Sequence, residues 1–365
     1  MTGMGWEVTT WGEVVELRYG KALRDYRDGD GTVAVYGTNG PVGSTNVPQA
    51  KGPGVVVGRK GAYRGVHYAP RDFWVIDTAF YIAPRRPLNM RWAYYALQLA
   101  DINGLDAGSA IPSTTRQAFA GLRAHVPPLG EQQAIAEVLG ALDDKIAANT
   151  ALAETTEASI AVAYTLASRD GVTHRPLLDE LVIEFGEPFG GPQFSQPGVG
   201  RPLIRIRDLK TFKSQVWSTE SRPREVVVAA GDVLVGMDAE FRATPWLGEP
   251  GLLNQRVLRA RHTTLGRALV REMLRRPLAE VESEKSATTV IHLNKADLAR
   301  KRVGMPHSDA LAAFERLAEP LYEARIALAV ENRTLAMTRD ALLPQLMSGK
   351  LRVRGAEAAA SEAGV

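Results

Sequence analysis

Cysteine is absent from the 365 residues of this sequence. Its absence excludes a disulfide framework, a zinc site with cysteine ligands and a cysteine nucleophile. No run of about 18 apolar residues is present, so the sequence predicts no membrane-spanning helix. The first residues, MTGMGWEVTTW, also lack the basic region and apolar run of a secretory signal. We therefore expect a cytoplasmic protein.

Motifs for catalysis and for metal binding are also missing. The sequence has no P-loop, and it has neither the Gly-rich cofactor loop nor the Asn-Pro-Pro-Tyr-like turn of an adenine methyltransferase. Its six histidines are scattered, without HxH or HExxH spacing. The segment RDGDGTV at 27–33 lacks the Gly and the Glu of a calcium loop and is interpreted as a turn. The sequence predicts a chain that is not an enzyme and that holds no metal or cofactor.

A long helix is predicted in the middle of the chain, directly after Pro127 and Pro128. Apolar or small residues recur there at steps of four and three, which is the 3.5-residue period of a coiled-coil seam. A seam that contains polar residues is too weak to hold an isolated helix, so this helix needs a partner. The seam positions are Ile135, Leu139, Leu142, Ile146, Asn149, Ala153, Thr156, Ile160 and Ala163.

A second seam with the same period follows Pro306 near the C-terminus. We predict that the two helices pair, because they share the proline start, the length and polar interruptions at comparable places. The alternative is two unrelated amphipathic helices, each packed on its own domain. Pro320 should kink or interrupt the second helix unless that helix begins after it. Its seam positions are Ala310, Phe314, Leu317, Leu321, Ala324, Leu328, Glu331, Leu335, Thr338 and Leu342.

The repeat extends upstream of the helices. Residues 109–128 align with 288–307 at an offset of 179, and GVVVGRKGAYRG at 54–65 has the pattern of GDVLVGMDAEFR at 231–242. The predicted fold is α/β (α+β), with a pseudo-twofold internal repeat of a globular module followed by a long helix. The predicted boundaries are 1–128 for the first module, 129–170 for the central helix, 171–306 for the second module, 307–353 for the C-terminal helix and 354–365 for a disordered tail.

Charge is distributed unevenly over this repeat. The first module carries 14 Lys and Arg against 10 Asp and Glu, and the second carries 21 against 16. The central helical block carries 2 against 7, and residues 307–365 carry 7 against 8. Two basic modules on a helical rod suit a polyanion with two separated sites, such as duplex DNA. On charge alone, chance sampling in a moderately charged protein explains the pattern equally well.

The segment GSAIPSTTRQAFAGLRAHVPPLGEQQAIAEVLGALDDKIAANT at 108–150 resembles the central signature of the specificity subunit of type I restriction-modification systems. The segment ENRTLAMTRDALLPQLMSGKLRV at 331–353 resembles the end of that family's chains. The resemblance implies two target-recognition domains separated by two long antiparallel coiled-coil helices. The chain departs from the family in reading LGEQ for Leu-Pro-x-Glu-Gln, and its second copy, PHSDALAAF, lacks Glu-Gln. These departures predict unequal docking of partners at the two ends.

The same resemblance implies a DNA-binding subunit that recognises a bipartite double-stranded target. It would direct two methyltransferase subunits, with restriction subunits added, and its paired helices would set the spacing of the half-sites and dock these partners. S-adenosylmethionine is then expected in the methyltransferase partner, and no cofactor is expected in this chain. The partner-docking candidates are Glu131, Gln132, Leu139, Leu142, Ile146, Leu321, Leu328 and Leu335.

DNA contacts are expected where basic and small polar residues gather in turns of the two modules, because Lys and Arg hold phosphates and reach guanine edges. In the first module the candidates are Thr38, Asn39, Arg59, Lys60, Tyr63, Arg64, Ser113, Thr114, Thr115, Arg116 and Gln117. In the second module they are Arg205, Arg207, Lys210, Arg242, Asn254, Gln255, Arg256, His292, Asn294 and Lys295.

Two other functions fit the same pattern. One is the specificity subunit of another methyltransferase-based defence system. The other is a coiled-coil scaffold that joins two protein-binding modules without binding DNA. Binding to duplex DNA that weakens steeply with salt would separate a DNA reader from the scaffold.

Overall fold

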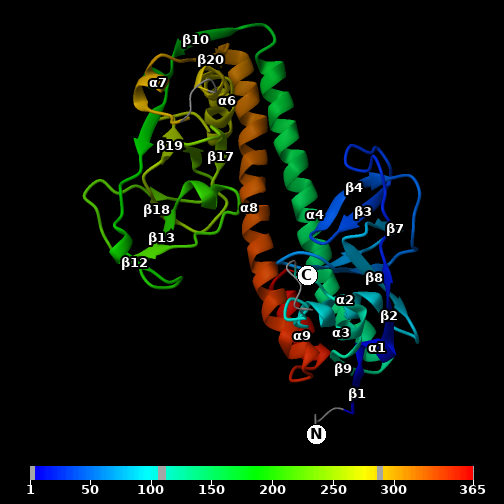
Figure 1. The fold of residues 1–365 in the computed structure, drawn as a ribbon. Helices are drawn as coiled ribbons and strands as arrows, with labels where there is room; N and C mark the ends of the chain where they lie inside the picture. The colour runs from blue at the N-terminus through cyan, green and yellow to red at the C-terminus, as the bar shows by residue number, and fades with distance from the viewer. Residues whose placement is uncertain (1–4, 106–111, 286–290, 365) are drawn as a thin grey trace. The chain divides into compact units, whose positions relative to one another are not determined.

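The computed structural model describes residues 5–105, 112–285 and 291–364 (Figure 1). The chain divides into two compact units: residues 1–146 with 334–365 form unit 1, and residues 147–333 form unit 2. Each unit holds one globular module together with a part of each long helix. The mixture of helix and sheet predicted from the sequence is confirmed.

A four-stranded antiparallel sheet is the centre of the first module, in the order β2 (Val15–Tyr19), β8 (Ala79–Pro84), β5 (Gly54–Gly58) and β6 (Val66–Ala69). Strand β5 reads GVVVG and is buried throughout, as expected for β-branched residues in an inner strand. A second sheet has the order β4 (Gly40–Thr45), β3 (Val33–Gly37) and β7 (Phe73–Val75), and β1 (Glu7–Thr10) pairs with β9 (Arg123–Val126). The helices are α1 (Trp11–Val14), α2 (Met90–Gln98) and α3 (Arg116–Ala120).

The second module is built in the same way. Its four-stranded antiparallel sheet has the order β11 (Val182–Phe185), β19 (Val257–Arg261), β16 (Val233–Gly236) and β17 (Ala243–Pro245), and β10 (Val172–Pro176) pairs with β20 (Arg302–Pro306). Another sheet has the order β12 (Phe194–Ser195), β14 (Trp217–Ser218), β13 (Arg201–Ile204), β18 (Gly251–Leu253) and β15 (Val227–Val228). The helices are α5 (Leu177–Glu180), η1 (Gly191–Gln193), η2 (Ile206–Leu209), α6 (Arg267–Lys285) and α7 (Lys295–Ala299).

The strand orders agree with the predicted internal repeat. In chain order, β2, β5, β6 and β8 of the first sheet correspond to β11, β16, β17 and β19 of the second, and the spatial order is also the same. The alignment offset of 179 places α3 on α7. Both of these short helices begin after a polar cap, because the side chains of Thr115 and Asn294 accept a hydrogen bond from the backbone three residues on. Ile111 and Val290, which the alignment pairs, lie outside the described residues.

Two long helices, α4 (Leu129–Ala167) and α8 (Ser308–Met347), contribute to both units. In unit 1, Leu139 and Leu142 of α4 share a core with Leu335, Leu342 and Leu346 of α8. An ion pair of 2.7 Å joins Asp143 Oδ1 to Arg339 Nη1. Within this unit the helices therefore contact each other along apolar positions of the predicted seams.

In unit 2 the same two helices run antiparallel, because residue numbers fall along α8 as they rise along α4 at the contact points. Asn149 donates a hydrogen bond of 2.8 Å to Glu331, and the ring of Tyr164 lies edge-on to that of Phe314 at 5.7 Å. Asn149 is only 4% exposed. One polar residue of each seam thus pairs with the other, as a buried amide requires, whereas the hydroxyl of Thr156 donates within its own helix to the carbonyl of Ala153.

The predicted seam of α8 is wrong in its first half. Leu317 is 55% exposed and Ala324 is exposed, whereas Ala318 and Tyr322 are buried. A helix of 3.6 residues per turn drifts away from a strict 3.5 repeat, and Tyr322 packs into the core of the second module. Pro320 does not interrupt α8. Its side chain is exposed, so we infer that water can pair with the carbonyl that the proline leaves free.

A third prediction that the structure corrects is the disordered tail at 354–365. Residues Val353–Glu362 form helix α9. Ala356 and Ala360, one helical turn apart, are buried in the core of unit 1. Their small side chains allow a closely packed helix, which an alanine-rich composition alone does not distinguish from a flexible tail.

Candidate nucleic-acid interface

Two arginines and an aromatic ring form a cationic cluster at the surface of the first module. The guanidinium carbon of Arg59 lies 5.0 Å from the ring centre of Tyr19, and that of Arg116 lies 4.9 Å from it. Tyr19 is 47% exposed, and its ring lies 4.9 Å from that of Phe80. The ring quadrupole attracts both cations. Arg116 is exposed, whereas Arg59 is half-buried and donates through Nη1 to the carbonyl of Asp77 at 3.0 Å.

The fold brings Arg59 and Arg116 together through backbone hydrogen bonds between two segments that are distant in sequence. The amide of Thr114 donates to the carbonyl of Arg59 at 2.9 Å, and Gly61 donates to Pro112 at 3.0 Å. Lys60 and Ser113 form an isolated β-bridge, and Thr115 then starts α3, which carries Arg116. The turn at 59–64 and the polar loop at 113–117, both predicted as DNA contacts, therefore form one surface.

Tyr19 was not predicted as part of this surface. A signal was present, because the tyrosine ends the β-branched and alternating segment VVELRY and is followed directly by Gly20 and Lys21. An exposed aromatic residue at the end of a strand is a common platform for a cation or a base.

The other candidates in the first module divide into exposed and structural residues. Lys60, Gln117, Asn39 and Tyr63 are exposed, with Tyr63 at 66%. The hydroxyl of Thr38 lies 2.5 Å from the carbonyl oxygen of Thr78 and 3.0 Å from that of Lys60, so it fixes the turn. We keep the exposed residues as DNA-contact candidates and assign Thr38 a positioning role.

Arg64 and Thr114 do not fit the prediction that they contact DNA. Arg64 is 1% exposed, and its guanidinium donates to the backbone carbonyls of Gly61, Ile102 and Asn103 at 3.0, 3.2 and 2.6 Å. Thr114 is 2% exposed. Both side chains are enclosed by the turn, and from there they cannot reach a phosphate without unfolding it.

In the second module the corresponding surface is a cluster of Arg256, His292 and Asp238. The imidazole Nδ1 of His292 lies 2.9 Å from Arg256 Nη1 and 2.8 Å from Asp238 Oδ1. Asp238 and His292 form an isolated β-bridge, as Lys60 and Ser113 do in the first module. Arg256 has a positive φ of 73°, a conformation that is unfavourable for a side chain of this size. The backbone thus holds an exposed arginine in a strained position beside an acid.

Acidic neighbours also accompany the other basic candidates of this module. Arg205 pairs with Asp208 at 3.2 Å, and its side chain is 19% exposed. Lys210 lies 3.8 Å from Glu240, and Arg242 lies 2.9 Å from Glu282. The side chains of Lys210 and Arg242 are largely exposed. Asn254 is 6% exposed, so it does not fit the prediction of a base contact. Asn294 caps α7 with its side chain. The remaining candidates, Arg207, Gln255 and Lys295, are exposed.

Several partner-docking candidates on the long helices are buried inside their own unit. Leu139, Leu142 and Leu335 are 0% exposed. Gln132 is 2% exposed, and its amide contacts the backbone of Asn89 and Pro127. These four residues are therefore not available to a partner. The other candidates are partly accessible, namely Glu131, Ile146, Leu321 and Leu328. Glu131 also accepts a hydrogen bond from the indole of Trp6.

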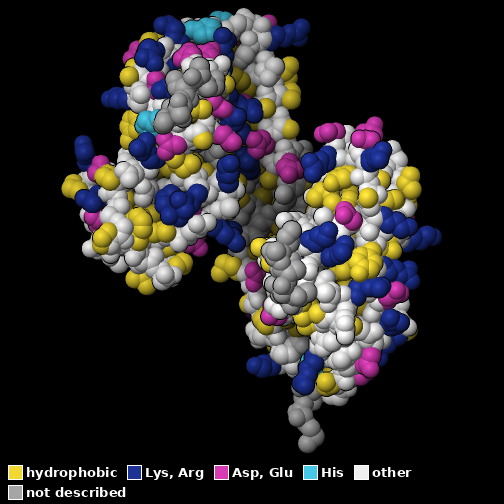
Figure 2. All heavy atoms as spheres, viewed as in Figure 1, with side chains coloured by type: hydrophobic (Ala, Val, Ile, Leu, Met, Phe, Trp, Pro, Cys, Tyr) yellow, Lys and Arg dark blue, Asp and Glu magenta, His cyan; other side chains and the backbone are white. Residues whose placement is uncertain are grey.

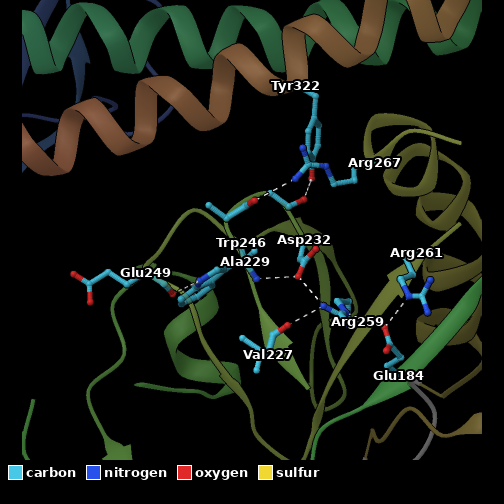
Figure 3. A network of polar contacts seen from close by, with 12 residues as sticks. Glu184, Val227, Ala229, Asp232, Trp246, Glu249, Arg259, Arg261, Arg267 and Tyr322 are labelled. Atoms are coloured by element: carbon cyan, nitrogen blue, oxygen red, sulfur yellow. Dashed lines mark hydrogen bonds and ion pairs between the residues drawn. The ribbon is translucent and has the colours of Figure 1, made fainter. Parts of the chain in front are cut away.

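Within unit 2, polar contacts join helix α8 to the second module (Figure 3). The hydroxyl of Tyr322 donates to the carbonyl of Gly231 at 2.8 Å, and the guanidinium of Arg267 lies over the Tyr322 ring at 5.6 Å. Burial raises the pKa of Tyr322, so the hydroxyl stays protonated and remains a donor. The module and this part of α8 therefore form one rigid element.

The network in Figure 3 continues into the central sheet. Arg259 donates to Glu184 at 2.9 Å and to Asp232 at 3.0 Å, and Arg261 donates to Glu184 at 3.1 Å. Burial alone would raise the pKa of Glu184, but these two arginines lower it below its ordinary value. The paired arginines stiffen the sheet and are not free to bind an anion.

Lys and Arg side chains are scattered over the visible surfaces of both units in Figure 2, and acidic side chains are interspersed among them. Among residues 5–105, 112–285 and 291–364, no cluster of three His, Asp or Glu residues is suited to hold a metal ion. No helix in the described part of the chain is long and apolar enough to cross a membrane.

Known proteins are similar to this chain in sequence and in fold. Residues 4–158 match the type I restriction modification DNA specificity domain. The type I restriction enzyme EcoBI specificity subunit of Escherichia coli is 30% identical over 173 residues, which are 47% of this chain and 32% of that subunit. The MjaIX specificity subunit of Methanocaldococcus jannaschii is 36% identical over 81 residues, which are 22% and 19% of the two chains. The matched part thus spans less than a third of each of these relatives.

The crystal structure of a type I restriction-modification system S subunit from M. genitalium has a TM-score of 0.65. The match covers 95% of this chain and 97% of that chain at 15% identity, which shows a shared fold. The domain match, the curated relatives and the fold agree with one another. The chain is therefore similar to specificity subunits of type I restriction-modification systems, in sequence over part of its length and in fold over most of it.

Proposed function

We propose that this chain recognises a bipartite duplex DNA target, with one half-site read by each module. The observation that carries the proposal is the repeated surface at the turn after the inner strand. In both modules this turn is joined by an isolated β-bridge to the segment before a short capped helix, and exposed arginines lie there. Repeated cationic surfaces of this kind are suited to phosphates and to base edges of two similar half-sites.

We further propose that the chain does no chemistry itself and directs methyltransferase subunits, to which restriction subunits are added. S-adenosylmethionine would then be bound by the methyltransferase partner. Exposed apolar side chains on the long helices support a docking role, because large apolar residues in contact with water mark interaction surfaces. Leu152 and Leu166 of α4 and Leu317 and Met337 of α8 are 52%, 62%, 55% and 71% exposed. They replace the four buried candidates as docking residues.

The proposal includes two recognition domains separated by paired long helices, whose length sets the spacing of the half-sites. The continuity of α4 over Leu129–Ala167 and of α8 over Ser308–Met347 supports it, because a regular helix has a fixed rise of about 1.5 Å per residue.

Methylation mapping of the host genome, with and without the gene for this chain, tests the function directly. We expect loss of adenine methylation at one two-part motif when the gene is removed. Inserting one heptad into both α4 and α8 should then change the spacer between the two parts and leave the parts themselves unchanged. If the motif is methylated equally in the absence of the chain, the chain does not direct this modification.

The alternative of a protein-binding scaffold is separated from DNA recognition by the salt dependence of duplex binding. A DNA reader should bind with a log K that falls linearly with log salt concentration, because counterions are released from phosphates. A scaffold should show no such dependence. If a DNA reader works in another methyltransferase-based defence system, the enzyme encoded next to its gene would identify that system.

A further inference from the structure

An arginine-lined pocket of about 460 Å³ lies in unit 2, beside the turn that follows strand β16 and carries Arg242. Its walls come from α4, α6, α8 and the segment at 241–245. Four arginines line it, Arg242, Arg271, Arg275 and Arg325, with Glu157 as the one carboxylate in the lining. A pocket with this lining is prepared for a ligand of negative charge.

Charge pairing inside the pocket leaves one cation in excess. Glu157 bridges Arg271 and Arg325, and its distance to Arg325 Nη2 is 2.6 Å. Glu272 bridges Arg271 and Arg275 at 3.1 and 3.0 Å. Three guanidinium groups therefore share two carboxylates. The side chain of Arg275 is 51% exposed, so the excess positive charge lies where an anion from solvent can reach it.

One arginine of the pocket also has an unpaired hydrogen-bond donor. The Arg325 side chain is 14% exposed, and its Nη1 atom is buried without a hydrogen-bond partner among the residues that the structure describes. Burial, followed by the neighbouring Arg271, lowers the pKa of Arg325 against the opposing effect of Glu157. A guanidinium in which one nitrogen is paired with a carboxylate and the other has no hydrogen-bond partner can supply half of a bidentate oxyanion site.

We propose that this pocket binds a phosphate-type oxyanion through Arg325 Nη1, with Arg275 and Arg242 at its rim. Their side chains are 51% and 61% exposed and can turn towards the ligand. The tetrahedral oxygens of a phosphate accept several guanidinium hydrogen bonds at once. The phosphate comes either from a DNA backbone or from a free inorganic or nucleotide phosphate. The site does not depend on the proposed DNA specificity.

The test uses the full-length chain and inorganic phosphate, with chloride at equal ionic strength as the reference. Phosphate should raise the midpoint of thermal unfolding more than chloride does, because a ligand that binds only the folded state stabilises it. Arg325→Met should weaken phosphate binding by about tenfold or more, the effect of one hydrogen bond between charged groups. Arg276→Met is the control, because Arg276 follows the pocket residue Arg275 on α6, is 81% exposed and is outside the pocket lining.

A second variant is expected to increase the affinity for phosphate, a result that loss of folding cannot produce. Glu157→Gln removes the carboxylate that competes with the ligand, and phosphate should then bind more tightly than to the unchanged chain. This variant decides the question even if Arg325→Met does not fold. A phosphate effect that is absent in the unchanged chain, or equal in the unchanged chain and Glu157→Gln, overturns the proposal.

A short duplex DNA distinguishes the two sources of phosphate. If the DNA backbone occupies the pocket, Arg325→Met should lower the slope of log K against log salt by about one. If a free phosphate occupies it, the slope should be unchanged and phosphate should not compete with DNA. These two outcomes identify the source of the phosphate, whereas the phosphate titrations decide whether the site exists. Methylation mapping is independent of both, so the proposed function and this site can fail separately.

Discussion

The two modules have the same strand order but fill the space beneath one turn with different side chains. In the first module the sequence AYR places Arg64 inside, at 1% exposure, where it donates to backbone carbonyls. In the second module EFR places Phe241 inside, also at 1%, and leaves Arg242 exposed beside Glu282. The repeat therefore preserves a filled position under the turn, while the chemistry that fills it changes.

A second difference concerns the cations that face solvent. Arg59 and Arg116 of the first module are held by a neutral ring, that of Tyr19. Arg256 of the second module lies beside His292 and Asp238, and the latter already offsets part of its charge. The first surface is suited to strong phosphate binding. The second, where an acid orients the arginine, is suited to selective contact with a base edge.

The largest effect is expected on stability, from the difference between Arg64 and Arg242. Arg64→Met should lower the free energy of unfolding by about 3 kcal/mol, because three buried carbonyls lose their donor. Arg242→Met should cost less than about 0.5 kcal/mol, because an exposed ion pair contributes little. Urea unfolding of both variants measures the difference. Equal losses would show that the two turns are not built differently.

A smaller effect is expected on DNA binding. Replacing Arg59 and Arg116 together by alanine should lower the slope of log K against log salt by about two, one for each phosphate that is no longer neutralised. Arg256→Ala should lower it by less than one, since Asp238 already competes for this charge. Salt-titrated duplex binding gives both slopes, and the exposed pair Arg71→Ala and Arg85→Ala serves as a control. A decrease of a full unit of slope with Arg256→Ala would remove the contrast between the surfaces.

The smallest effect concerns acid stability. The pKa values of Asp144, paired with Arg91, and of Glu184, paired with Arg259 and Arg261, are both lowered in the folded chain. A lowered pKa contributes stability above the unfolded pKa, near 4, and this contribution is lost as pH falls through the lower folded value. The side chain of Asp144 is 70% exposed and that of Glu184 only 25%, so screening reduces the first effect more.

We therefore expect Glu184→Gln to lower stability at pH 7 more than Asp144→Asn, with both effects on the order of 1 kcal/mol or less. Once the pH has fallen through the folded pKa, the difference between each variant and the unchanged chain should disappear, because the carboxylate is then protonated in both states. Thermal unfolding between pH 2 and pH 7 measures both effects. A constant difference over this range would mean that the ion pairs do not account for the lower stability.

The sequence by itself determined the repeat, the long helices and the resemblance to type I specificity subunits. Those features are periodic or local: apolar steps of 3.5 residues, prolines before each helix and buried β-branched strands all follow from short-range chemistry. It also placed the polar pair of the seam, since Asn149 and Glu331 interrupt the two seams and bond to each other.

Only the tertiary structure decided which side chains are exposed to solvent and which are buried. Four polar residues look like surface residues in the sequence but are buried, because segments distant along the chain cover them: Arg64, Thr114, Gln132 and Asn254. The contact of Arg116 with Tyr19 and the pocket around Arg325 exist only because segments far apart in the sequence meet in the fold. Composition and period describe a residue's own element, whereas exposure depends on every element packed against it.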